Sequence, residues 1–549
     1  MPNRRESFLA ALLWIAALGV NLFTATRSPT AWHDEVYFAD PAVHFAMGEG
    51  FRTTAWTLVP EGLHWPGLVP AYGYGLGVWL KAFGVGLWQV RALPILLAAV
   101  AGGWVWWLAR RRGHVGSAGA GMLLLALLLC GAGAVFSYRS GRADALAMLW
   151  WAAAYAALGW RAGFQPAMAA KMAALLMFLL GAIAPWCGLF LGPYVAVMGA
   201  ILLWLGGRPW VGRVIAAYAG FGLGTLCLVA FYQSIGGWEA FVACSRHYQD
   251  GILSPHFRLR LDGYRDFSLL LVLAGLMVAL VALPRGSPGR RFSLAALIAA
   301  LVVGPALALL GKFPTYYSWL VFFPAALALA HAMPALAATG RRAALGLAGA
   351  ACLVGLPARL GLCAWEWRLR DHRAVEAFAS GVFRDADRVA CHPSAYFALR
   401  RVSGEVYPRA TDLIGEIPAE ARDRMTAACV QPEVDAGQLG SIFGGQLVRV
   451  ASLGDAADGP RRGRAEPYRL VAYRRVAAGG RASSEGLAPF GGGPAGRRSP
   501  KGLRYGGGRG ACGIRRSWPS AGGRHQGHFA TMGRYRGMGR PRCGGGARP

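Results

Sequence analysis

Charge is scarce in this chain, and acidic charge is the scarcer sign. Only 15% of the 549 residues are charged, and 27 Asp and Glu stand against 57 Lys and Arg. Soluble globular proteins carry about 25% charged residues, whereas 55% of this chain is hydrophobic. The shortage of charge argues against an ordinary soluble protein, and we expect a polytopic membrane protein.

Recognisable metal-ligand spacing is also missing. The ten cysteines form no C-x-x-C pair and no zinc-finger pattern, so no structural zinc site is indicated. Cys391 and Cys429 lie in a more polar part of the chain. We expect them to form a disulfide if that part faces an oxidising compartment; two separate buried thiols are the alternative.

The net charge of +30 resembles that of a nucleic-acid-binding protein, but its distribution argues against that function. Residues 481–549 alone hold 14 Lys and Arg against one Glu. Much of the remaining positive charge lies in short loops between apolar segments, where it orients membrane proteins and meets anionic headgroups. We therefore expect membrane lipids, and no nucleic acid, as partners.

Apolar segments near the length of a bilayer span recur along the first two thirds of the chain. We predict eleven spans: 7–25, 88–109, 118–137, 143–161, 168–183, 186–206, 213–232, 267–284, 292–310, 314–332 and 342–361. With Arg4 and Arg5 in the cytoplasm, alternation places every basic-rich short loop on the cytoplasmic side, as the positive-inside rule requires. Segment 67–83 would break that pattern if it spanned, so we expect a re-entrant or interfacial element there.

Three regions follow from this pattern. Residues 1–361 form an all-α transmembrane domain with a long outer loop at 26–87. Residues 362–475 are more polar and predict a small α/β domain on the outer side, with strands at 388–392, 445–452 and 468–474 and helices at 372–380 and 418–429. Residues 476–549 are rich in Gly and Arg and predict a disordered basic tail; a translation artefact is the alternative.

The most conspicuous polar motif is Trp32-His33-Asp34-Glu35, a few residues after the first span. Adjacent carboxylates near a membrane surface are costly when partly desolvated, and such groups are usually functional. A solvated pair of loop acids is the alternative. Asp34 and Glu35 are thus the first candidates for catalytic groups.

Further motifs follow in a set order. They are Glu61-Gly62-Leu63-His64-Trp65-Pro66, Phe83-Gly84, Arg91 at the start of the second span, Arg142-Ala143-Asp144 at the start of the fourth, and Lys312-Phe313-Pro314-Thr315-Tyr316-Tyr317 before a late span. Together with Asp34-Glu35, this order resembles the GT-C class of polyprenyl-phosphate-dependent glycosyltransferases. Within that class it is most similar to the bacterial protein O-mannosyltransferase and aminoarabinose transferase group. The resemblance covers residues 1 to about 361.

The resemblance implies an inverting glycosyltransferase in a bacterial-type inner membrane, acting on the outer face. The donor would be a sugar on polyprenyl phosphate, and the acceptor a lipid, a protein or a glycan. Asp34 would be the general base beside Glu35, since an acceptor hydroxyl needs a proton acceptor. The expected substrate-binding residues are His33, His64, Arg91, Arg142, Asp144, Arg246, Lys312, Tyr316 and Tyr317.

Each of these assignments has a structural alternative. Arg142 and Asp144 can form an ion pair at a helix start, Lys312 can be an interfacial lysine, and the two tyrosines can be aromatic-belt residues. Arg246 belongs to outer loop 233–266, which either caps the site or is an ordinary interfacial loop. We expect no cofactor; a divalent ion near His33 and His64 is the weaker alternative, without ligand spacing to support it.

A second class of function is a transporter or flippase for a lipid-linked or small substrate. Such proteins usually carry inverted repeats and broken helices near the membrane midplane. No internal repeat is evident in this sequence, and its conspicuous polar residues gather on one face of the predicted bundle. These two observations favour the enzyme.

Overall fold

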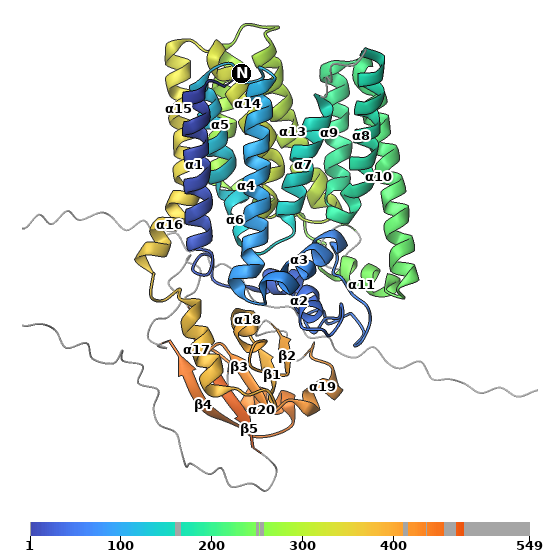
Figure 1. Cartoon of the computed structure of the whole chain (residues 1–549), viewed down its shortest axis with the longest axis vertical. Helices are drawn as coiled ribbons and strands as arrows, with labels where there is room; N and C mark the ends of the chain where they lie inside the picture. Colours follow the sequence, from blue (N-terminus) through green and yellow to red (C-terminus); the bar gives the residue numbers. More distant parts are fainter. Residues whose placement is uncertain are drawn as a thin grey trace, which may run out of the picture. The chain divides into compact units, whose positions relative to one another are not determined.

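The computed structural model describes residues 2–159, 166–248, 252, 257–409, 416–434, 436–454 and 468–476. They lie within one compact unit, residues 1–490. The predicted basic tail lies outside the described residues except for Val476. Most of the described chain is helical, and a five-stranded sheet follows the helical part (Figure 1).

The described bundle has helices at all eleven positions where spans are predicted. Its helices are α1 (Arg4–Phe23), α4 (Leu87–Arg111), α5 (Ala118–Cys130), α6 (Ala132–Arg139), α7 (Asp144–Leu158), α8 (Pro166–Cys187), α9 (Leu191–Gly206), α10 (Arg208–Ser234), α12 (Phe267–Ala282), α13 (Pro288–Leu310), α14 (Trp319–Ala332), α15 (Ala338–Leu353) and α16 (Leu356–Trp365). Among the described residues, six helices are long and apolar enough to cross a membrane, counting α15 with α16 as one. The bent pair of α5 and α6 adds a seventh, and α7, α9, α12 and α14 are shorter apolar helices.

Basic residues lie at one end of the bundle, where they contact the ends of helices. Arg110 forms a buried ion pair with Glu6 of the first turn of α1. Arg112 donates to the carbonyls of Tyr155 and Ala156 at 2.7 and 2.6 Å, in the last turn of α7. The last carbonyls of a helix lack intrahelical partners, so these arginines stabilise the bundle as well as following the positive-inside pattern.

The break between α5 and α6 bends the pair by 47°. Asp266, at the start of α12, accepts a hydrogen bond from the Gly133 amide at 3.0 Å and one from the Ser318 hydroxyl at 2.6 Å. The Ser268 hydroxyl accepts from the Ala132 amide at 3.0 Å. Buried side chains thereby satisfy the backbone groups freed at the break, as interrupted helices at membrane depth require. The bend carries α6 toward the segment that precedes α14.

Loop 26–87 folds into α2 (His33–Ala46) and α3 (Pro70–Phe83), which pack against each other at the end of the bundle opposite the N-terminus (Figure 1). The 14-residue α3 begins with Pro70 and ends at Gly84. At 1.5 Å per residue it measures about 21 Å, too short for a bilayer core of about 30 Å. Because α14 also has 14 residues, length alone does not distinguish α3 from the predicted spans. The packing of α3 against α2 agrees with the prediction of an element that does not span.

The C-terminal sheet has the order β2-β1-β3-β5-β4. The strands are β1 (Arg388–Cys391), β2 (Glu405–Pro408), β3 (Ala427–Val430), β4 (Leu447–Leu453) and β5 (Leu470–Arg475). β1 runs parallel to β2 and β3, whereas β5 is antiparallel to β3 and β4. All four residues of β3 are buried, as expected for a central strand covered on both faces.

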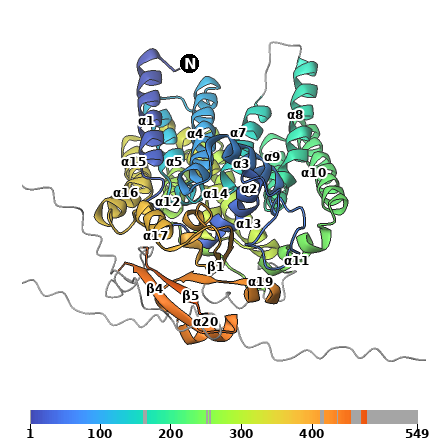
Figure 2. The ribbon, with the colours of Figure 1, turned by 60° about the horizontal axis from the view of Figure 1, so that its bottom comes forward.

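Helices cover both faces of this sheet (Figure 2). α17 (His372–Val382) and α18 (Tyr396–Leu399) share a core with one face, and α19 (Ala419–Arg424) and α20 (Ala436–Phe443) share a core with the other. The predicted helix 418–429 is wrong in its second half, because Ala427–Val430 is strand β3. Its small and β-branched apolar residues fit a narrow position between two strands.

Cys391 and Cys429 are aligned partners on the neighbouring parallel strands β1 and β3. Both are free thiols and fully buried in this structure. The expected disulfide is therefore not formed, although the strands bring the two residues side by side. The two thiols instead fill the core beneath α17 and α18.

Candidate active site

Asp34 lies in the first turn of α2, at the end of the bundle where loop 26–87 folds back. A carboxylate in the first turn is favoured by the positive end of the helix dipole. His33 contacts one oxygen at 3.0 Å, and the Asp34 side chain keeps 17% of its surface exposed. Asp34 is thus held in place yet accessible.

Arg142 is the residue that draws Asp34 into a larger cluster. Its Nη1 donates to Asp34, and its Nε donates to Asp144 at 2.7 Å. The Arg142 side chain is only 3% exposed. Asp144 is 2% exposed, and its second oxygen has no hydrogen-bond partner among the described residues. The ion pair considered for Arg142 and Asp144 does form, but the same guanidinium also reaches the candidate base.

Aromatic rings enclose the Arg142 guanidinium. It lies 3.7 Å from the centre of the Tyr316 ring and within 6 Å of the rings of Phe38, Trp32 and Tyr317. Stacking on an aromatic face suits a planar guanidinium and strengthens when water is excluded. The predicted Tyr316 and Tyr317 therefore line the candidate site.

The electrostatic field at Asp34 is positive. Burial alone would raise the pKa of Asp34, but Arg142, His33 and Lys312 outweigh it and hold that pKa well below its usual range. Burial and the Asp34 charge raise the pKa of the Tyr316 hydroxyl well above 10. Asp34 is therefore ionised at neutral pH, and Tyr316 keeps its proton as a hydrogen-bond donor.

Glu35 points away from this cluster into a buried ion pair. Both of its oxygens accept from Arg91 of α4, each at 2.6 Å, and neither side chain is exposed. Arg91 also donates to the carbonyls of Ala25 and Pro29 at 2.6 and 2.7 Å. The pair therefore fixes the path of the chain from α1 into α2, which places Asp34.

Gly141 allows the chain to pass close to Glu35, and this brings the neighbouring Arg142 to Asp34. Its φ is +66°, and a Cβ on it would lie 2.5 Å from a Glu35 oxygen. The buried Tyr72 of α3 donates to its carbonyl at 2.7 Å. A larger residue at 141 would therefore push Glu35 aside and strain the turn.

The structure separates two predicted substrate-binding residues from the cluster. His64 contacts the hydroxyl of Tyr74 at 2.9 Å and packs edge-on against Phe51. Arg246 is an exposed residue of α11 (Trp238–Tyr248). Among the described residues, neither shares a contact with Asp34 or Arg142.

His392, at the start of the sheet domain's 3-10 turn η4 (Pro393–Ala395), is a residue that the sequence analysis missed. Burial, and next the His33 charge, lower the pKa of His392 to about 4, and η4 packs on α2. Phe38 was missed as well. The one sequence signal for Phe38 was its spacing, since a residue one helical turn after Asp34 lies on the same face of α2.

The described residues of this region form no metal-binding arrangement. Among the described residues, no group of three or more His, Cys, Asp and Glu is placed to hold an ion. His33 and His64 also make separate contacts, the former with Asp34 and the latter with Tyr74.

The fold and this cluster define the protein as a polytopic membrane protein with an acidic and aromatic site at one end of its bundle. The fold is similar to that of ArnT from Cupriavidus metallidurans. The crystal structure of ArnT bound to undecaprenyl phosphate superposes with a TM-score of 0.59 at 14% identity, covering 85% of this chain and 98% of that one. The apo structure gives 0.55 at 15% identity over the same shares. No family model and no curated protein matches the sequence.

This similarity confirms the GT-C-like fold that the order of motifs predicted. At this level of identity it concerns the fold alone.

Proposed function

We propose that this protein is an inverting glycosyltransferase that moves a sugar from polyprenyl phosphate to an acceptor at the outer face of a bacterial inner membrane. The observation that carries the proposal is the meeting of Asp34, Arg142 and Tyr316 from three distant segments. A proton acceptor, an enclosed cation and a phenolic donor are the groups that this transfer needs. The binding of undecaprenyl phosphate by ArnT, whose fold is similar, supports a lipid of that class.

In the proposed reaction, the acceptor hydroxyl attacks the anomeric carbon of the sugar. The new carbon–oxygen bond forms as the bond to the phosphate oxygen breaks, and polyprenyl phosphate leaves with that electron pair. Asp34 takes the hydroxyl proton. Attack opposite the leaving group inverts the anomeric configuration, and the carboxylate also tolerates the oxocarbenium-like charge.

Arg142 would stabilise the leaving phosphate, together with Lys312 and the hydroxyls of Tyr316 and Tyr317. Fixed cationic donors in a site that excludes water stabilise a developing anion strongly. A phosphate that binds Arg142 competes with Asp34 for the guanidinium. This competition raises the pKa of Asp34 and makes the carboxylate a better base when the donor is in place.

The test is transfer by the purified full-length protein from synthetic polyprenyl-phosphate sugars, with Asp34→Asn and Asp262→Asn compared. Asp262 is a more exposed aspartate of the 3-10 turn η1 (Asp262–Arg265). Asp34→Asn should lower kcat about 10²–10⁴-fold while donor binding persists, and Asp262→Asn should match wild type. Near wild-type turnover of Asp34→Asn removes Asp34 from the mechanism. Donor binding without any transfer by wild type favours a transporter or flippase.

A further inference from the structure

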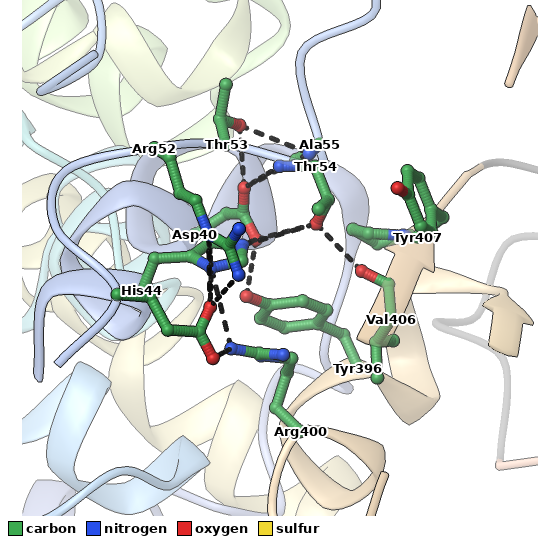
Figure 3. Close-up of polar contacts among 12 residues, drawn as sticks. Asp40, His44, Arg52, Thr53, Thr54, Ala55, Tyr396, Arg400, Val406 and Tyr407 are labelled. Carbon is green, nitrogen blue, oxygen red and sulfur yellow. Dashed lines mark hydrogen bonds and ion pairs between the residues drawn. The ribbon is translucent and has the colours of Figure 1, made fainter. Parts of the chain in front are cut away.

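The helix that carries Asp34 also carries a buried polar cluster at its other end (Figure 3). Asp40 and His44 lie one turn apart on α2, and each is at most 1% exposed. Fully buried charged groups persist only when they are paired and hydrogen-bonded. The partners of these two residues come from two other segments of the chain.

Asp40 joins three segments through its carboxylate. One oxygen accepts from the Thr53 hydroxyl at 2.6 Å and from the Thr54 and Ala55 amides at 2.8 and 3.0 Å. The other oxygen accepts from the Tyr396 hydroxyl of α18 at 2.5 Å. One side chain thus ties α2 to its own following loop and to the sheet domain.

The second link runs through Glu49. Its oxygens contact His44 at 2.5 Å and the buried Arg400 of the sheet domain at 2.9 Å, while Arg52 pairs with it from the surface at 2.6 Å. Asp40, His44 and Arg400 are buried, whereas Glu49 is 23% exposed. Both carboxylates lie beside His44 and favour its protonated form.

Backbone contacts complete the same interface. Arg409, which follows β2, donates to the carbonyls of Thr54 and Ala55 at 2.6 and 2.9 Å, and Thr54 donates to the Val406 carbonyl at 2.7 Å. Apolar residues of α2 and of the sheet domain also belong to one core cluster, among them Val36, Val375 and Phe397. The sheet domain is therefore joined to α2 by both polar and apolar contacts.

The interface matters for Asp34 because its residues lie close to Asp34 on the same helix. Asp40 lies six residues after Asp34, which is less than two helical turns. Pro41 lies inside the helix and cannot donate to the Tyr37 carbonyl. Trp56 donates to that carbonyl instead, at 2.8 Å. The loop therefore also supports α2 where its own hydrogen bonding is interrupted, between the anchored end and Asp34.

We propose that the sheet domain is a positioning element for the transferase, in which Tyr396 and Arg400 hold α2 through Asp40 and Glu49 and so keep Asp34 in register with Arg142. This inference rests on the proposed function of Asp34. It gives the C-terminal domain a task that does not require it to touch the donor. A misplacement of about 1 Å at a reacting group costs on the order of 10²-fold in rate, so a small loosening of α2 is measurable.

The experiment compares Tyr396→Phe with Tyr407→Phe in the full-length protein. Each change removes one hydroxyl that donates to a carboxylate, at 2.5 Å to Asp40 and at 2.6 Å to Glu405. Both tyrosines lie in the sheet domain and are buried, but the second contacts a carboxylate of its own domain. Hydrogen–deuterium exchange of residues 33–46 is measured alongside kcat and the donor KM.

Tyr396→Phe should speed exchange in 33–46 and lower kcat about tenfold, with donor KM changed less than twofold. Tyr407→Phe should leave all three quantities near wild type. Identical behaviour of the two variants overturns the proposal, and so does faster exchange in Tyr396→Phe without loss of kcat. Absence of transfer in wild type defeats the proposed function instead, and that outcome is read before any variant is compared.

Discussion

The guanidinium of Arg142 donates to the carboxylate of Asp34, which lies 108 positions earlier in the chain. It donates at the same time to Asp144 at the start of α7. A single arginine thus joins the helix that carries the candidate base to the transmembrane bundle.

Arg142→Gln should move the acid limb of the transfer rate to higher pH. Arg142 is the strongest of the groups that lower the pKa of Asp34, and the proposed transfer requires the ionised carboxylate. Without the guanidinium the pKa of Asp34 rises, so protonation inactivates the enzyme at a higher pH than in wild type. The measurement is kcat/KM from pH 4 to 9. An unmoved acid limb would show that Asp34 does not govern it.

Lys312→Ala should raise the donor KM by about tenfold, which corresponds to about 1.4 kcal/mol, with a smaller effect on kcat. Lys312 contributes positive charge at Asp34 and would meet the donor phosphate there. Arg265→Ala is the control, because Arg265 is 84% exposed and pairs with Asp262 in its own turn. Equal donor KM values in the two variants would make Lys312 a lipid-interface residue.

Glu35→Gln should lower stability more than it lowers catalysis per folded molecule. Removing one partner of a fully buried ion pair costs about 3–5 kcal/mol, because the other charge is left buried. Thermal unfolding in detergent measures this loss against Asp262→Asn. The double variant Glu35→Gln/Arg91→Gln should recover part of the stability. A stable Glu35→Gln protein with greatly reduced kcat would instead restore Glu35 as a catalytic group.

Cys391 and Cys429 should both react as thiols once the protein is unfolded without reductant. Burial raises the pKa of each thiol, so little reactive thiolate is present in the folded protein near pH 7 and labelling should be slow. Mass spectrometry of the labelled peptides reports each residue. An unlabelled pair that becomes reactive only after reduction would reveal a disulfide.

Cysteines introduced at Arg285 and Arg341 should label from the cytoplasm, and cysteines at Gly50 and Arg401 from the outside. All four positions are exposed, whereas Ser394, which also lies in the sheet domain, is 8% exposed and would label poorly. The assay uses an impermeant maleimide on intact cells and on inverted vesicles. Cytoplasmic labelling at Arg401 would contradict the orientation that the basic loops predict.

The sequence by itself determined the features that depend on local pattern. Apolar length predicted where the helices of the bundle lie, because a bilayer core sets the length of a crossing helix. Among the described residues, six helices, or seven with the bent pair, reach that length. Charge bias predicted that Arg4, Arg5 and Arg110–Arg112 share one end of the bundle. The order of Asp34, Arg142 and Lys312 along the chain predicted the GT-C-like fold.

Only the tertiary structure decided which of the two adjacent carboxylates contacts Arg142 and which contacts Arg91. Asp34 and Glu35 are adjacent in sequence, yet Asp34 meets Arg142 whereas Glu35 is buried against Arg91. Successive residues of a helix point about 100° apart, so the start of α2 and its packing assign the two roles. The Asp40–Tyr396 contact could not be predicted either, because its two residues lie 356 positions apart. Strand β3 could not be predicted because it depends on its place between two neighbouring strands.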